Sequence, residues 1–281
     1  MKNSRLNLRA IAAIIMLSLV FTACSKDEDV DTPEVQDQDV TEVTRLAEID
    51  EASEAMTDIM IDVYEFDSNE SGRNASPPGG LPDCVTITVV LEQGSRLVTI
   101  DFGTEGCEVR GNILKGKIIM SYERDPQAQE VMISYTLEDF FFNDKNVLGS
   151  KTLLKQLSND NGNPQFTHTL DLTVIWPDGA EASREGLKIR EWVEGFGSGI
   201  WSDNVFEITG NWTSTFRNGN VHTYEVIVPL RREVICTYFV SGSFEVQRTN
   251  FGGVFDYGDG DCDNQATFTF NDGTVIDITL N

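Results

Sequence analysis

The sequence predicts an all-β fold: an antiparallel meander, arranged as a sandwich or a barrel, of about a dozen strands with one amphipathic helix before them. From Cys84 onward, apolar and polar residues alternate with the period of two that a half-buried strand shows, first over 85–91 and again over 98–102. Three pairs that favour tight hairpin turns lie between strand-like runs: Asp178-Gly179, Asn218-Gly219 and Asp272-Gly273. No helical pattern interrupts these runs, which favours an antiparallel sheet over a parallel one.

The first residues have the pattern of an export signal. A basic segment, 2–9, precedes an apolar run over 11–21 that a single serine interrupts. This run is shorter than the roughly 20 apolar residues that a transmembrane helix needs, so it indicates a peptide removed on export. The residues that end at Cys24 resemble a lipobox, which implies cleavage before Cys24 and attachment of its thiol to lipid. We therefore expect a lipoprotein signal peptide over 1–23, with ordinary secretory cleavage near Ala23 as the alternative.

An acidic tether is expected to follow over 24–41, because a segment with so many like charges repels itself and cannot form a core. Its first residues, 25–29, read Ser-Lys-Asp-Glu-Asp. They resemble the acidic export signal of Bacteroidetes-type surface lipoproteins. The resemblance implies a protein anchored in the outer membrane and exposed at the cell surface. The alternative is that 25–29 is a solvated spacer and that the domain stays on the periplasmic face.

The balance of charge limits the partners. The chain has 21 basic and 46 acidic side chains and a formal net charge of -25. Affinity for nucleic acids comes largely from Lys and Arg side chains that neutralise phosphates. We therefore expect no nucleic-acid partner, whereas solubility outside the cell and binding of divalent cations are compatible with this acidity.

The segment 42–83 carries the one helical signal and a loop. Apolar residues recur at three- and four-residue spacing over 42–66, and Asp39 followed by Glu42 resembles a capping box at the start. Several Pro and Gly residues break the pattern over 67–83. The apolar stripe of the helix must pack on something, most simply on the β domain over 84–281.

Four cysteines remain once Cys24 is assigned to lipid: Cys84, Cys107, Cys236 and Cys262. Disulfides persist in exported proteins, but spacing alone leaves three connectivities. An internal repeat favours one of these three connectivities. Residues 101–107 and 256–262 both read Asp, aromatic, Gly, three residues, Cys, and each copy follows a cysteine that opens a strand. Folding each copy back as a hairpin brings its two cysteines together, which selects Cys84–Cys107 and Cys236–Cys262.

This repeated unit, with the strand pattern over 84–281, resembles a family of uncharacterised Bacteroidetes-type all-β lipoproteins that carry disulfides. The resemblance covers most of the mature chain. It implies a class and a location, and it implies no activity.

Two candidate sites can be named. The acidic, glycine-containing turn near the second repeat carries Asp256, Asp259, Asp261 and Asp263, which could supply oxygen ligands to calcium. The alternative there is a solvated turn, and we expect no other cofactor. The aromatic residues Trp192, Phe196 and Trp201 lie in or beside a glycine-rich loop and could stack on a glycan. The alternative for them is filling of the core, because aromatic side chains dominate buried area.

No catalytic set is recognisable, so catalytic residues stay unknown. The two histidines, His168 and His222, share strand faces with apolar residues and are expected to be packed, and no nucleophile elbow occurs. The prediction is a noncatalytic binding or structural module that contacts a glycan or an envelope protein. One alternative is a carbohydrate-active hydrolase with paired carboxylates, which the sequence offers no way to choose among 46 acids. The other is a periplasm-facing component of an envelope complex.

Overall fold

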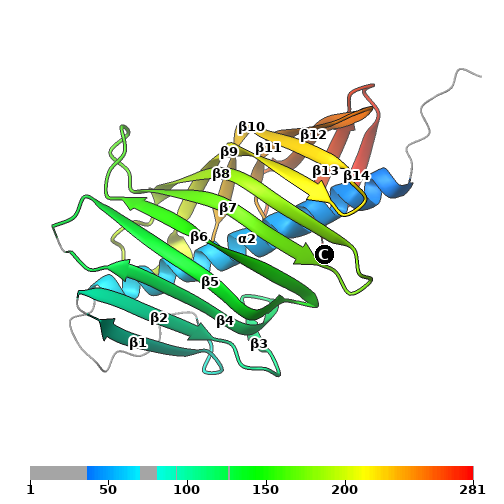
Figure 1. Ribbon diagram of the computed structural model, residues 1–281. Helices are drawn as coiled ribbons and strands as arrows, with labels where there is room; N and C mark the ends of the chain where they lie inside the picture. The colour runs from blue at the N-terminus through cyan, green and yellow to red at the C-terminus, as the bar shows by residue number, and fades with distance from the viewer. Residues whose placement is uncertain (1–36, 70–80, 93, 126, 281) are drawn as a thin grey trace, which may run out of the picture. The chain divides into compact units, whose positions relative to one another are not determined.

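In a computed structural model, the strands of the chain form one antiparallel sheet whose order follows the sequence (Figure 1). The structure describes residues 37–69, 81–92, 94–125 and 127–280. Cys24, the signal peptide and the cluster 25–29 lie outside the described residues. The chain divides into two units, Met1–Val40 and Thr41–Asn281.

The helix and strands have the following bounds: α2 Asp37–Asn69, β1 Thr86–Glu92, β2 Ser95–Asp101, β3 Cys107–Val109, β4 Asn112–Glu123, β5 Glu130–Phe142, β6 Lys145–Gln156, β7 Gln165–Ile175, β8 Glu181–Glu194, β9 Val205–Phe216, β10 Val221–Glu233, β11 Ser241–Arg248, β12 Phe251–Asp259, β13 Gln265–Phe270 and β14 Val275–Thr279. A short 3-10 helix, Trp201–Asp203, lies between β8 and β9.

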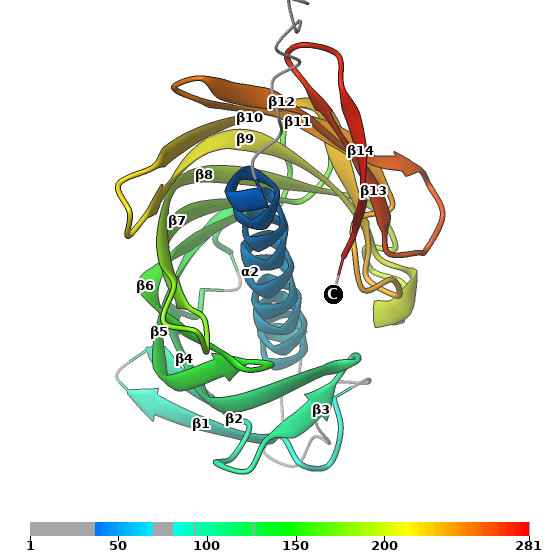
Figure 2. The same cartoon turned by 90° about the vertical axis from the view of Figure 1, so that its right-hand side faces the viewer.

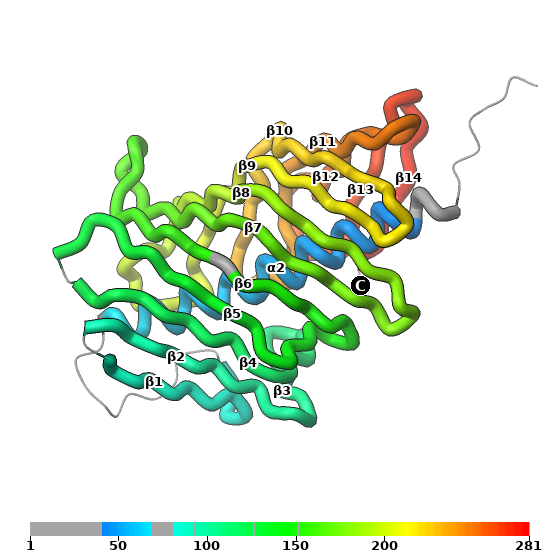
Figure 3. Tube along the Cα trace, viewed as in Figure 1, coloured from blue at the N-terminus to red at the C-terminus, as the bar shows by residue number. Residues whose placement is uncertain are grey.

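The all-β prediction is confirmed, with a particular arrangement. The described strands form one 14-stranded sheet in which β1 and β14 are the edges and β3 pairs only with β4. The colour in Figure 3 accordingly runs across the sheet in chain order. Figure 2 shows that this sheet curls around α2. The helix therefore fills the interior, where a sandwich would have a second sheet.

The predicted turns and strands are confirmed for most of the sheet. On β7 the burial of the side chains alternates along the whole strand, as the pleat requires. The glycines of the three predicted hairpin turns, Gly179, Gly219 and Gly273, all have positive φ. The exception is β1, whose apolar residues Val89 and Leu91 are exposed. It was predicted to be half-buried, but it is an edge strand with a neighbour on one side only.

Helix α2 is longer than the sequence predicts and is buried on more than one face. It begins at Asp37, so it includes residues assigned to the tether, and Asp39 lies inside it. The predicted capping box is therefore wrong. The carboxylate of Glu42 instead accepts hydrogen bonds from residues of the sheet, among them His222 and Arg248. The predicted apolar stripe is buried, and so are the acidic side chains of Asp50 and Asp58, because the sheet curls around the helix.

The predicted disulfides are both confirmed. Cys84 is bonded to Cys107 and Cys236 to Cys262, with Cα–Cα distances of 5.8 and 5.4 Å. In each case the bond joins the residue before a β-hairpin to the segment after it, as the folding back of a hairpin requires.

The sequence repeat is also a repeat of local structure. In the first copy the carboxylate of Asp101 accepts a hydrogen bond from the amide of Gly103 at 2.8 Å, and in the second Asp256 accepts one from Gly258 at 2.7 Å. Both glycines have positive φ, 73° and 91°. The aromatic residue between them, Phe102 or Tyr257, is buried in both copies. The motif is therefore a turn that buries one aromatic ring and directs the chain toward the second cysteine.

Candidate functional site

A row of acidic side chains on α2 faces basic side chains on the inner face of the sheet. The acids recur every fourth residue, so they lie on one side of the helix. The basic partners on β8 recur every second or fourth residue, so they lie on one face of the strand. The ion pairs are Asp50–Arg184 at 2.5 Å, Asp50–Lys188 and Glu54–Lys188 at 2.8 Å, Glu54–Arg190 at 3.3 Å, Asp58–Arg232 at 2.8 Å, and Asp58–Arg190. We call this set the buried ladder.

The buried ladder is almost completely removed from water, with side-chain exposures between 0% and 6%. Burial alone would raise the pKa of Asp58, but Arg190 and Arg232 beside it hold that pKa below its ordinary value. The charged form is therefore the one that the fold selects. None of these residues is among the site residues that the sequence predicts. The acids of the buried ladder recur every fourth residue over 50–58 and its bases on β8 every second or fourth residue over 184–190, so each set lies on one face of its element. That spacing is a signal for the buried ladder, but basic residues on an alternating strand are ordinarily assigned to the solvent face.

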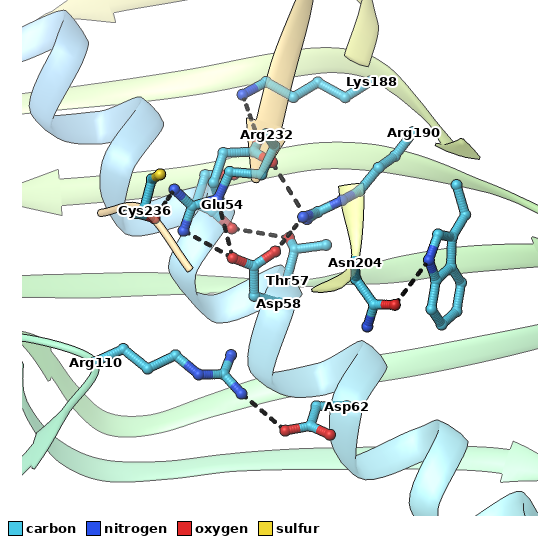
Figure 4. A network of polar contacts seen from close by, with 12 residues as sticks. Glu54, Thr57, Asp58, Asp62, Arg110, Lys188, Arg190, Asn204, Arg232 and Cys236 are labelled. Carbon is cyan, nitrogen blue, oxygen red and sulfur yellow. Dashed lines mark hydrogen bonds and ion pairs between the residues drawn. The ribbon is translucent and has the colours of Figure 1, made fainter. Parts of the chain in front are cut away.

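Arg232 connects the buried ladder to the second disulfide. Its Nε and Nη2 donate to Asp58, and its Nη1 donates to the carbonyl of Cys236 at 2.6 Å (Figure 4). The same Nη1 also donates to the carbonyls of Thr237 and Tyr238. One side chain thus fixes the segment between β10 and β11 against the helix.

A cavity of about 1000 Å³ lies beside this end of the buried ladder. The cavity is bounded by α2, the β3–β4 turn, the β8–β9 loop and the β10–β11 segment. The residues that line it include Asp58, Asp62, Arg110, Phe196, Trp201 and Ile235. Ligand pockets in proteins commonly measure about 300–1,000 Å³, so this cavity is large enough for a small molecule.

The aromatic residues predicted for ligand stacking all line this cavity. Trp192 is buried, its Nε1 donates to Asn204 Oδ1 at 3.1 Å, and its ring lies 5.0 Å from Phe196 and 6.2 Å from Trp201, centroid to centroid. Trp192 therefore forms the wall of the cavity and offers no open face to a sugar. Phe196 is 51% exposed and forms part of the rim. Stacking on a ligand stays a prediction.

Gly195 shapes the loop that carries this rim. Its φ is 86°, and a Cβ atom at this position would lie 2.4 Å from Asn204 Oδ1. Both the left-handed backbone and the close approach require glycine. The Asn204 side chain that would be displaced is the one that binds the indole of Trp192.

Arg110 forms the polar end of the cavity. It lies in the β3–β4 turn with φ of 52°, its Nη2 donates to Asp62 at 2.8 Å, and its guanidinium lies 5.3 Å from the ring centroid of Trp201. Burial raises the pKa of Asp62 to about 6, and the effect would be larger without Arg110. In the described part of the chain, Arg110 Nη1 and Trp201 Nε1 are buried without a hydrogen-bond partner.

Comparison of the chain with models of protein families, with characterised proteins and with solved structures finds no match. In addition, no helix among the described residues has both the length and the apolar character that crossing a membrane requires.

The acidic turn gives no sign of a metal site. Asp256 and Asp263 use their carboxylates to accept hydrogen bonds from backbone amides of the turn. Asp259 and Asp261 are exposed. Over residues 37–69, 81–92, 94–125 and 127–280, no three His, Cys, Asp or Glu side chains are grouped as metal ligands. Calcium at this turn stays a prediction.

The two histidines are packed in the interior. The ring of His168 is hydrogen-bonded to the hydroxyl of Tyr135 at 2.8 Å, and that of His222 to Glu42 at 2.9 Å. Both are buried and neither lines the cavity. These contacts fit the role that the sequence predicts for them.

Proposed function

We propose that the protein is a noncatalytic binding module, anchored to outer-membrane lipid through Cys24 and facing the cell surface, that holds a small ligand in the cavity beside Asp62. The observation that carries this proposal is the cavity itself, about 1000 Å³ with aromatic walls and a polar end. Mostly apolar cavities with a few convergent polar groups are the usual form of ligand sites.

The rim of the cavity supports binding. Phe196, Ile200 and Ile235 line the cavity, yet they are 51%, 58% and 69% exposed. Large apolar side chains gathered at one opening mark a surface that another molecule covers. A purely structural role would not explain why these three side chains gather around one opening.

A hydrolase with paired carboxylates is less well supported by this site. Asp58 and Asp62 lie one helical turn apart and both line the cavity. However, both oxygens of Asp58 are engaged by Arg190 and Arg232, and its side chain is only 1% exposed. Asp62 has a pKa suited to an acid at about 6, but catalysis of this type needs a second free carboxylate. Release of reducing sugar from a polysaccharide panel would support the hydrolase instead.

The test of binding uses the full mature chain with Cys24→Ser, produced without residues 1–23, so that it carries neither lipid nor the apolar run over 11–21. The probe is the neutral fluorescent molecule N-phenyl-1-naphthylamine. We expect saturable binding at one site. Ala55 lines the cavity on α2, so Ala55→Phe should place a ring in the cavity and weaken binding. Val228→Phe places the same ring at an exposed position of β10 that does not line the cavity, and it should leave binding unchanged. Equal binding by both variants would reject the cavity as the site.

The proposed location has a separate test. The support for it is the pattern of residues 1–29 and the resemblance to Bacteroidetes-type lipoproteins. Protease treatment of intact cells, with a periplasmic protein as the control for leakage, should digest the domain and spare the control. Protection of the domain until the outer membrane is broken would instead favour a periplasm-facing envelope component.

A further inference from the structure

Two hydrogen-bond donors of residues that line the cavity have no acceptor among the described residues. Arg110 Nη2 binds Asp62, whereas Arg110 Nη1 is buried and unpartnered among the described residues, and so is Trp201 Nε1. Figure 4 shows Arg110 with one nitrogen on Asp62 and the other directed away from it. Buried donors without acceptors are costly, so an acceptor on a ligand would be stabilised beside this pair.

These two donors lie close together. The guanidinium carbon of Arg110 is 5.3 Å from the ring centroid of Trp201, and both residues line the cavity. Within the described chain, the unpartnered buried side-chain atoms that belong to residues lining this cavity are these two nitrogens, and both are donors. A ligand group that accepts two hydrogen bonds therefore fits better than one that donates them.

The charge of the surroundings favours an anion. Within the described chain, the buried ladder contains three acids, Asp50, Glu54 and Asp58, against four bases, Arg184, Lys188, Arg190 and Arg232. It thus carries one positive charge in excess, and Arg232 lines the cavity. Asp62 and Glu65 also line the cavity, but each is paired with a base, Arg110 and Lys155, so they leave this excess unchanged. Glu51 interacts with Arg232, but burial raises its pKa to about 7. A bound anion would balance this charge more completely than Glu51 does.

We propose that the ligand is an amphipathic molecule with an oxyanion head, which accepts hydrogen bonds from Arg110 Nη1 and Trp201 Nε1 while its apolar body lies against Phe196, Ile200 and Ile235. The head matches the polar residues of the lining and the body matches its apolar residues. A guanidinium binds carboxylate oxygens strongly because the hydrogen bonds are charge-assisted. A cationic head would face Arg110 and is disfavoured by repulsion. This inference rests on the proposed function and specifies its ligand class.

The experiment compares three probes that share one alkyl chain and differ in the head: decanoate, decanol and decyltrimethylammonium. Binding to the full chain with Cys24→Ser is measured by titration calorimetry at pH 7, below the concentrations at which the probes form micelles. Decanoate is expected to bind roughly tenfold or more tightly than decanol, which is the effect of one or two hydrogen bonds to a charged group. Decyltrimethylammonium is expected to bind most weakly.

Two variants locate the head. Arg110→Gln removes the cation, and Trp201→Phe removes the indole donor while keeping an aromatic ring. Each should lower the affinity for decanoate severalfold to tenfold and change that for decanol less than twofold. Arg217→Gln is the matched control, because Arg217 is an exposed arginine away from the cavity. If Arg110→Gln fails to fold, Trp201→Phe still tests the position of the head.

The outcomes distinguish failure of the oxyanion head from failure of the binding module. Equal affinity for decanoate and decanol, tighter binding of the cation, or equal losses for both probes in the variants would overturn the oxyanion head and leave the binding module intact. Failure of the three probes and of the neutral fluorescent probe to bind would overturn the binding module itself.

Discussion

Replacing Asp58 by asparagine tests the buried ladder most directly. The substitution keeps the shape of the side chain and removes the charge that accepts hydrogen bonds from Arg190 and, at 2.8 and 3.1 Å, from Arg232. The three side chains are 1%, 3% and 6% exposed, so water cannot replace the lost carboxylate. Removing one partner of a buried ion pair costs about 3–5 kcal/mol. Since domains are typically stable by about 5–15 kcal/mol, the loss should be a large fraction of the total.

The assay is urea unfolding of the full chain with Cys24→Ser at pH 7, followed by tryptophan fluorescence. With a slope of about 3 kcal/mol/M for a domain of this size, the midpoint should fall by roughly 1 to 2 M. Glu138→Gln is the control, because Glu138 forms a 2.5 Å pair with Lys117 at the surface, with side-chain exposures of 52% and 36%. Such pairs contribute about 1 kcal/mol or less.

A second variant separates the lost pair from the charge left behind. Asp58→Leu combined with Arg190→Met should lose less stability than Asp58→Asn alone, because Arg232 is then the one base of the buried ladder without a carboxylate, while Glu54, which loses Arg190, keeps Lys188 as its partner. Its Nη1 still donates to the carbonyls of Cys236 and neighbouring residues. If Asp58→Asn lost no more stability than Glu138→Gln, the buried charge of Asp58 would not stabilise the fold more than a surface charge does.

Two further outcomes follow from the structure. Replacing both cysteines of either disulfide by alanine, the pair Cys84 and Cys107 or the pair Cys236 and Cys262, should lower the free energy of unfolding by about 3 kcal/mol. The reason is that each bond closes a loop with a separation of 23 or 26 residues. Urea unfolding that showed no loss of stability in either variant would contradict this. Burial raises the pKa of Asp62 from its ordinary value of 3.8 to about 6, so the folded state binds this proton more tightly than the unfolded state does. The stability that Asp62 contributes is therefore gained as the pH falls through 6 and lost as the pH rises. Unfolding measured at pH 7 and pH 5 should therefore show a smaller gain on acidification in Asp62→Asn than in the parent chain, and equal gains would refute the assignment.

The buried ladder also gives a reason for the length of α2. A single helix inside a curved sheet is surrounded on several sides, so its polar face has no water to meet. The sequence meets this constraint by placing acids at four-residue intervals opposite bases of the sheet. Such pairs define which side of the helix faces β8, since a rotation of the helix about its axis would carry Asp50, Glu54 and Asp58 away from their partners.

Much of the fold could be predicted because its signals are local. The alternation over 98–102, the glycine turns and the repeat around Cys107 and Cys262 each involve residues that are neighbours along the chain or across one hairpin. The apolar stripe of the helix likewise depends only on spacing. The edge strand β1 shows the limit: the alternation is present, but the burial of its residues depends on which strands lie beside it.

The sequence by itself thus determined the class of the fold, the positions of most strands, both disulfides and the buried apolar face of the helix. Only the tertiary structure decided that Arg184, Lys188 and Arg190 point inward, because a basic side chain is stable there only where an acid from a distant helix meets it. The cavity is a tertiary feature for the same reason. Arg110, Phe196 and Ile235 are far apart along the chain, and no local pattern indicates that the curl of the sheet brings them to one opening.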